Sequence, residues 1–266
     1  MHDDADIVAT QHLASLLGPD EQPAFTCRDG NPQSPFVIIG DHASRLIPAA
    51  LGALGLSEAD IDRHIGWDIG IGGVVEHLAD QLDAFAIRQN YSRLVVDCNR
   101  PLESSTLIAE VSESTTIPGN AGLTQAKRQQ RLDEIFWPYH RAIDVELDRR
   151  IHAGVPTLFV SMHSFTPTYK GETRPWQLGV LHHRRADVAE NALAILRESG
   201  EWVVGDNEPY AITLTSEYSI PTHGEGRGLP CVEFEIRQDL IESAIQQQIW
   251  AMRFAEWLRT LSKQVL

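Results

Sequence analysis

Two histidines in this sequence closely follow short apolar segments, one in a His-x-Ser and one in a His-Ser setting. His163 follows residues 157–160, whose β-branched and aromatic side chains predict a buried strand. His42 follows the apolar run 35–40 in the same way. Open α/β sheets bind ligands at the carboxyl ends of their strands, so two such histidines could hold one metal ion or form one catalytic centre. A single histidine there is more commonly just a hydrogen-bonding residue, and it is the pair that favours a site.

A third apolar segment, residues 229–237, carries charged side chains. A strand with period two places Glu233, Glu235 and Arg237 on one face and apolar residues on the other. An acidic row of this kind needs solvent, an edge position or a polar site. In a sheet that is covered on both faces, a polar site would compensate for burying the carboxylates.

The block 91–101 combines an apolar run with groups that recognise carboxylates. Arg93 precedes the run, and Asp97, Asn99 and Arg100 follow it. The planar guanidinium of an arginine can form two parallel hydrogen bonds with a carboxylate, and an asparagine could add a neutral donor. The alternative is that Arg93 forms a salt bridge with Asp97 at the end of a strand and that residues 99–101 form a turn.

The elements that would position these residues alternate between strands and helices. Strands are predicted at 36–40, 84–88, 93–97, 156–162, 177–182 and 229–236, with a weaker one at 202–204. Helices are predicted at 5–17, 57–65, 71–83, 122–152, 185–199 and 238–263, and Pro138 predicts a kink or break near Trp137. This order indicates one domain over residues 1–266, a three-layer α/β/α fold with a mostly parallel central sheet. The loops 102–121 and 166–176 lack periodicity and could cover the site.

Composition excludes several classes of partner. The chain has 266 residues, 42% of them hydrophobic and 22% charged, as in ordinary globular proteins. Its formal charge of −15 argues against binding to nucleic acid or to an anionic membrane. No apolar run is long enough to span a membrane, residues 1–6 are acidic rather than basic as in a signal peptide, and the three cysteines are widely spaced. These features predict a cytoplasmic protein, and they leave its oligomeric state open.

Four segments are the most distinctive part of the sequence: Asp-His-Ala-Ser at 41–44 with Pro48, Trp-Asp at 67–68, Ser-Arg-Leu-Val-Val-Asp-Cys-Asn-Arg-Pro at 92–101, and His-Ser at 163–164. Together they resemble the N-formylglutamate amidohydrolase family over roughly residues 35 to 240. That family resembles the zinc carboxypeptidases in fold, so the resemblance implies a zinc-carboxypeptidase-like architecture.

The resemblance also implies roles for individual residues. His42 and His163 would be zinc ligands, and Glu235 would be the general base and then the general acid. Asn99 and Arg100 match an Asn-Arg pair that binds the substrate's carboxylate in the carboxypeptidases. His223 matches a segment of the amidohydrolases that would line the pocket.

One departure leaves the metal site incomplete. The carboxypeptidases have His-x-x-Glu at the first ligand segment, whereas Arg45 stands three residues after His42. Because catalytic zinc usually has three protein ligands, Asp68 is the candidate for the third, with a helix N-cap or an outer-sphere role as the alternative. Asp41 and Asp97 could orient an imidazole by accepting its second N–H. A His2-carboxylate site would also accept divalent ions other than zinc.

The expected function is therefore zinc-dependent hydrolysis of a small acidic N-acyl amino acid such as N-formylglutamate. In such a reaction Arg93 could stabilise the oxyanion that forms at the amide carbonyl. The alternatives are a carboxypeptidase-like enzyme acting on a peptide or cell-wall fragment, and a binding protein without turnover. Glu235 disfavours the binding protein, because a protein that only binds has no use for a buried base.

Overall fold

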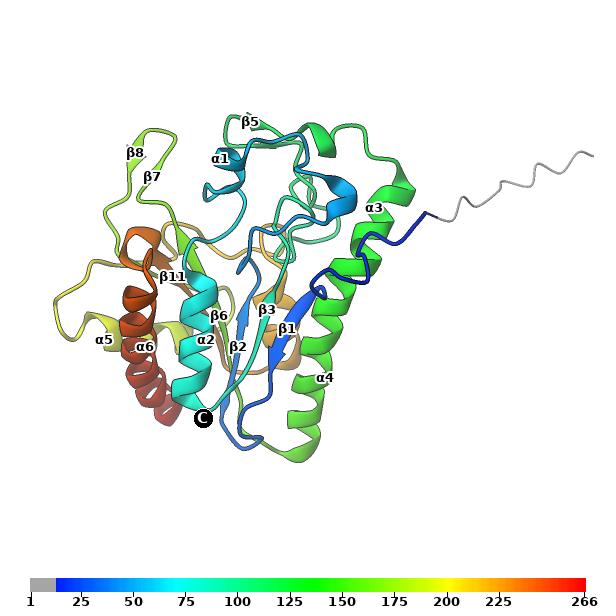
Figure 1. The fold of residues 1–266 in the computed structure, drawn as a ribbon. Helices are drawn as coiled ribbons and strands as arrows, with labels where there is room; N and C mark the ends of the chain where they lie inside the picture. The colour runs from blue at the N-terminus through cyan, green and yellow to red at the C-terminus, as the bar shows by residue number, and fades with distance from the viewer. Residues whose placement is uncertain (1–12) are drawn as a thin grey trace, which may run out of the picture.

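The computed structural model describes residues 13–266, and a seven-stranded sheet crosses the middle of the molecule (Figure 1). The helix predicted at 5–17 falls mostly on residues 1–12, outside the described part of the chain, and residues 13–17 are not helical. Within the described residues, no helix is both long and apolar enough to cross a membrane.

Four neighbouring strands at the centre of the sheet run parallel to one another. In spatial order the sheet consists of β1 (Phe25–Arg28), β3 (Phe85–Gln89), β2 (Phe36–Gly40), β6 (Leu158–Phe165), β11 (Cys231–Arg237), β9 (Leu178–Leu181) and β10 (Val204–Asp206). The strands from β3 to β11 are parallel, β1 is antiparallel to β3, and β9 is antiparallel to β11 but parallel to β10. The prediction of a mostly parallel sheet is therefore confirmed, with antiparallel pairings toward both edges.

Helices cover both faces of this sheet. On one face lie α2 (Ile71–Leu82), α5 (Ala186–Arg197) and α6 (Ala244–Val265) (Figure 1). On the other lies α4 (Trp137–Ala153), which is preceded in the chain by α3 (Gln125–Arg131). Strand β6 contributes to both cores, because Val160 and Met162 pack with the first group of helices and Phe159 packs with the second. The three-layer α/β/α class is confirmed.

Two small hairpins and a short helix make up the loops near the carboxyl ends of the central strands. The helix α1 (Glu58–Ile61) covers only part of the predicted 57–65. The hairpin of β4 (Val111–Ser112) and β5 (Thr115–Thr116) lies in the loop predicted at 102–121. The hairpin of β7 (Thr168–Tyr169) and β8 (Glu172–Thr173) lies in the loop predicted at 166–176.

The strand predicted at 93–97 is wrong. These residues form consecutive turns, in which the Ser92 hydroxyl bonds the Leu94 amide and the Asp97 amide bonds the Leu107 carbonyl. Leu94, Val95 and Val96 are buried in one core cluster with residues of α4. Their apolar run therefore has the same pattern as a buried strand. The short edge strand β1 has exposed residues and was not predicted.

The long helix predicted at 122–152 is interrupted near Pro138, as expected. A π-helical turn over Leu132–Phe136 separates α3 from α4, and Pro138 lies in the first turn of α4, directly after this irregular turn. The last helix begins at Ala244 rather than 238, because Ser243 and Gln246 form a capping box.

Candidate active site

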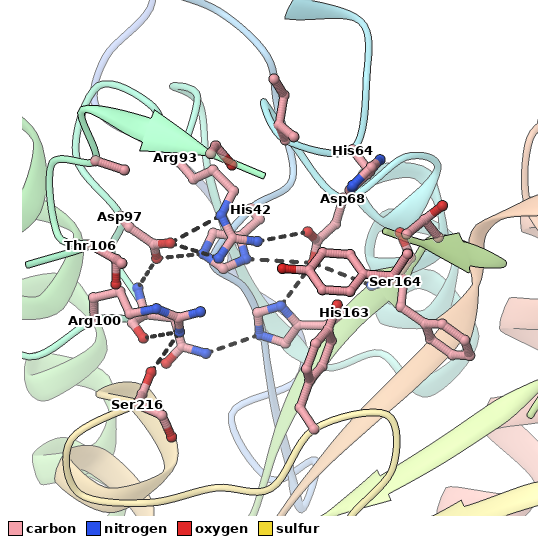
Figure 2. Close-up of a pocket in the computed structure, with 18 of the residues that line it drawn as sticks. His42, His64, Asp68, Arg93, Asp97, Arg100, Thr106, His163, Ser164 and Ser216 are labelled. Atoms are coloured by element: carbon pink, nitrogen blue, oxygen red, sulfur yellow. Dashed lines mark hydrogen bonds and ion pairs between the residues drawn. The ribbon is translucent and has the colours of Figure 1, made fainter. Parts of the chain in front are cut away.

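The candidate site lies at the carboxyl ends of β2, β6 and β11. His42 follows β2 by two residues, and His163 lies within β6 directly opposite Glu235 of the parallel strand β11. Ser161 and Glu233 form the preceding same-face pair of that register. Because side chains alternate along a strand, these four strand residues project from one face of the sheet, toward His42 and Asp68. Figure 2 shows His42, Asp68 and His163 converging there.

Three side chains from separate parts of the chain meet closely enough to hold one metal ion. One donor atom from each of His42, Asp68 and His163 lies within 4.8 Å of the others, and all three residues are buried. Nδ1 of His163 lies 2.8 Å from Oδ2 of Asp68, and Nδ1 of His42 lies 3.5 Å from the same oxygen. Nδ1 of His42 is buried and makes no hydrogen bond within residues 13–266. Buried nitrogen atoms normally have a hydrogen-bond partner, so this free nitrogen beside a carboxylate is consistent with a metal ligand.

The opposite nitrogen of each imidazole faces a hydrogen-bonding group. Nε2 of His42 lies 2.6 Å from Oδ1 of Asp97. Nε2 of His163 lies 3.0 Å from the Ser161 hydroxyl and 3.4 Å from a carboxylate oxygen of Asp41. Histidines that bind metals usually donate their second N–H in this way, which leaves the other nitrogen free to ligate. Two imidazole nitrogens and one carboxylate match the protein ligands of catalytic zinc sites. The donor set therefore fits the ion that the sequence predicted.

Arg93 connects the carboxylates of this centre. Its Nε and Nη2 lie 3.0 and 2.7 Å from Oδ2 of Asp97, and its Nη1 lies 3.4 Å from Oδ1 of Asp68. The salt bridge with Asp97 that the sequence allowed is present, and Arg93 also lines the pocket. Burial alone would raise the pKa of the Asp97 carboxyl, but Arg93 and His42 hold it well below its usual range.

Glu235 has the opposite electrostatic environment. It is buried, its Oε2 has no hydrogen-bond partner in the described part of the chain, and it lines the pocket. Burial raises its pKa well above the usual range; His163 opposes this, whereas Asp68 and Glu233 add to it. A buried carboxyl group beside a candidate metal is placed where a general acid or base would act.

Asn99 and Arg100 link the turn after Asp97 to the loop before β11. Oδ1 of Asn99 accepts from the amides of Tyr218 and Ser219 at 3.1 and 3.0 Å, and its Nδ2 lies 3.4 Å from Nε2 of His163. Nη1 of Arg100 donates to the carbonyls of Asn99 and Ser216. Both residues thus lie at the site and are held from two sides.

A pocket of about 550 Å³ opens over this centre. All but one of the predicted catalytic, substrate-binding and metal-binding residues line it: His42, Asp68, Arg93, Asn99, Arg100, His163 and Glu235. Both loops that were expected to cover the site contribute as well, through Thr106, Val111, Tyr169 and Lys170. The volume is in the usual range of about 300–1,000 Å³ for small-molecule sites.

His223 is the predicted site residue that the structure does not bring into this pocket. It lies in a π-helical turn, where it is buried against α4 and bonds Nδ1 of His140 at 2.8 Å and Oδ1 of Asp144 at 3.0 Å. The turn directs the side chain toward the helix, away from the strand ends. The prediction that His223 lines the pocket is therefore corrected.

Tyr210 and Glu217 are among the pocket residues that were not singled out in the sequence. Both lie in the irregular segment between β10 and β11, where no periodicity or motif marks them. Only the return of this segment over the strand ends places them beside Arg100 and Glu235.

Comparison with known proteins identifies the family. A model of the N-formylglutamate amidohydrolase family matches residues 34–242. The chain belongs to this family. The family predicted from the four sequence segments is thereby confirmed, and it makes the protein a hydrolase of amide bonds.

Two solved structures extend the comparison. The crystal structure of gene product Atu2144 from Agrobacterium tumefaciens is 32% identical, covers 94% of this chain and 99% of its own, and has a TM-score of 0.90. The N-formylglutamate amidohydrolase from Ralstonia eutropha JMP134 is 17% identical over 90% of this chain and 99% of its own, with a TM-score of 0.66, and it shows a similar fold. No curated protein is significantly similar to the chain.

Proposed function

We propose that this amidohydrolase is zinc-dependent and removes the formyl or other small acyl group from an N-acylated acidic amino acid, with N-formylglutamate as the first candidate. The observation that carries the proposal is the convergence of His42, Asp68 and His163 next to the strand that bears Glu235. Within residues 13–266, the buried Nδ1 of His42 has no hydrogen bond. The family membership supports the reaction type.

The residues would hold the metal through Nδ1 of His42, Nδ1 of His163 and the carboxylate of Asp68. When bound there, a divalent metal supplies polarisation of the amide carbonyl and a water that ionises near pH 7. Asp97 keeps the His42 ring in place by accepting its Nε2–H, and Asp41 with Ser161 does the same for His163. The donor set itself would also accept other divalent ions, so zinc is the preferred member of a class.

Glu235 would move the proton. It accepts a proton from the attacking water and then delivers it to the amine nitrogen as the carbon–nitrogen bond breaks, which yields a carboxylate and a free amino acid. Glu235 lines the pocket, and its Oε2 has no hydrogen-bond partner in residues 13–266, so this oxygen is available to carry the proton. Arg93 lines the same pocket and would stabilise the oxyanion, a contribution of about 2.7–4 kcal/mol for one well-placed donor.

Arg100 would bind the carboxylate of the amino acid. Its protein contacts all involve one nitrogen: Nη1 donates to the carbonyls of Asn99 and Ser216 and to the carboxyl of Glu217. Across residues 13–266, Nε and Nη2 bond no protein group, so this edge of the guanidinium is available for two parallel hydrogen bonds.

The substitution Glu235→Gln tests the proposal, because it keeps the shape of the side chain and removes its ability to exchange a proton. We expect the zinc-loaded wild type to release glutamate from N-formylglutamate, and we expect kcat of the variant to fall by about 10²–10⁴. Elemental analysis should show equal metal content in both proteins, and Glu256→Gln on the exposed side of α6 is the matched control. Full turnover by Glu235→Gln would refute the role of Glu235. Absence of amide cleavage by the metal-loaded wild type, across N-formyl and N-acetyl amino acids, would refute the proposed function.

A further inference from the structure

The pocket contains a buried carboxyl group that the proposed reaction does not use. Glu217 is 9% exposed and lines the pocket beside Arg100. Its Oε1 accepts a hydrogen bond from Nη1 of Arg100 at 3.2 Å. Its Oε2 is buried and has no partner among the residues that the structure describes. An unsatisfied buried oxygen on a pocket wall is costly unless something binds it, so this oxygen indicates a contact to a ligand.

The charges around Glu217 come from three directions. Glu233 on β11 and Asp97 in the turn after Val96 disfavour a negative charge on Glu217. Arg100 and His163 favour that charge. Burial, with Glu233 as the next contribution, raises the pKa of Glu217 to about 8. At neutral pH the side chain is therefore a carboxylic acid with one O–H to donate. Since Oε1 accepts from Arg100, the proton belongs on Oε2.

We propose that Glu217 acts as a hydrogen-bond donor that selects an anionic substrate: its Oε2–H binds the same substrate carboxylate that the free Nε and Nη2 edge of Arg100 holds. This inference rests on the proposed function and extends it to substrate choice. An arginine alone would also tolerate a neutral carbonyl group, whereas a paired arginine and carboxylic acid complete the hydrogen bonds of a carboxylate. Ionised Glu217 would instead repel the substrate.

This arrangement makes substrate affinity depend on pH in a defined direction. Below pH 8 Glu217 is protonated, and the dissociation constant stays flat. Above pH 8 the binding-competent fraction decreases, so at pH 9 the affinity should be about tenfold weaker. For a basic substrate the sign reverses, because ionised Glu217 would attract a cation.

Binding can be measured separately from turnover in the zinc-loaded Glu235→Gln protein. We would titrate it with N-formyl-L-glutamate by calorimetry between pH 6.5 and 9.5. With Glu217 present, we expect the tenfold weakening at pH 9 and uptake of one proton per ligand above pH 8, read from buffers of different ionisation enthalpy. Adding Glu217→Gln should abolish both alkaline effects, since an amide donates at every pH. Glu110→Gln, which alters an exposed side chain of the loop 102–121, is the control and should keep both effects.

Several results would overturn this inference. One is a loss of substrate affinity at alkaline pH that persists in Glu217→Gln, and another is a tenfold loss of affinity in that variant at pH 7. A third is that N-formyl-L-glutamate does not bind at any pH. The last is that N-formyl-L-arginine binds in preference to it and binds more tightly above pH 8. If Glu217→Gln fails to fold, the proton uptake of the protein that retains Glu217 still decides the matter, because no uptake above pH 8 excludes a protonated donor. If N-formyl-L-glutamate binds as expected but the wild type never cleaves it, only the proposed function fails.

Discussion

Replacement of Asp97 by asparagine should weaken metal binding without removing a metal ligand. The carboxylate of Asp97 is buried and receives hydrogen bonds from Nε2 of His42 at 2.6 Å, from Nε and Nη2 of Arg93 at 3.0 and 2.7 Å, and from the Asn99 amide at 2.9 Å. Asparagine offers one oxygen in place of two. If that oxygen stays with His42, its NH2 group faces the cationic Arg93; if it turns to Arg93, the NH2 group faces the N–H of His42.

The magnitude follows from what each orientation loses. A hydrogen-bond partner that orients a ligating histidine is typically worth 10–100-fold in metal affinity, or about 1.4–2.7 kcal/mol. Folding stability should also fall, by about 1–3 kcal/mol for charged hydrogen bonds lost in a buried site. We expect the lower part of that range, because Arg93 is partly exposed and keeps Asp68 at 3.4 Å.

Zinc affinity measured against a chromophoric chelator, and urea unfolding of the metal-free protein, would give the two quantities. The matched control is Asp148→Asn, which alters an exposed carboxylate of α4 that bonds Arg227, and it should leave zinc affinity unchanged. If Asp97→Asn binds zinc within twofold of the wild type, then Asp97 does not orient His42 for the metal, and this reasoning is wrong.

Two further predictions concern stability. Burial lowers the pKa of His140 from 6.5 to about 3, so the native state keeps this ring neutral; the stability that depends on it is fully present above pH 6.5 and is lost as the pH falls toward 3. Urea unfolding between pH 7 and 4 should therefore show a steeper loss, by up to about 1.4 kcal/mol per pH unit, in the wild type than in His140→Gln, and parallel curves would contradict this. Gly70 has φ +82, and a Cβ there would lie 2.1 Å from the Ile241 carbonyl oxygen. Gly122 also has a positive φ but has open space around its Cβ position, so Gly122→Ala should lower the free energy of unfolding only by left-handed strain, about 1–2 kcal/mol. Gly70→Ala should lower it by more, as measured by equilibrium unfolding. Equal losses in the two variants would mean that the backbone at Gly70 moves aside without cost.

Particular elements show where sequence patterns succeeded. The predicted strand at 36–40 matches β2, and the segments around His163 and Glu235 match β6 and β11, because each is a continuous or alternating apolar run that packs in the middle of a covered sheet. The period-two placement of Glu233 and Glu235 on one face agrees with their register opposite Ser161 and His163.

Patterns misled where burial has another origin. Residues 93–97 are as apolar as a strand, but they are turns packed under α4, and only their hydrogen bonds to Ser92 and Leu107 reveal this. His223 stands in a motif-like segment, yet its partners are His140 and Asp144, 83 and 79 residues earlier in the chain. Local sequence does not encode the direction in which such a turn faces.

The sequence by itself determined the chemical groups of the site and the layer architecture, because apolar periodicity and motif spacing extend over a few residues and can be recognised directly in the sequence. Only the tertiary structure decided which atoms meet: that both Nδ1 atoms face Asp68, that Asp97 serves His42 and Arg93 together, and that Glu217 comes to lie beside Arg100. These contacts join positions up to 117 residues apart, so they depend on how the strands, turns and returning loops pack against one another.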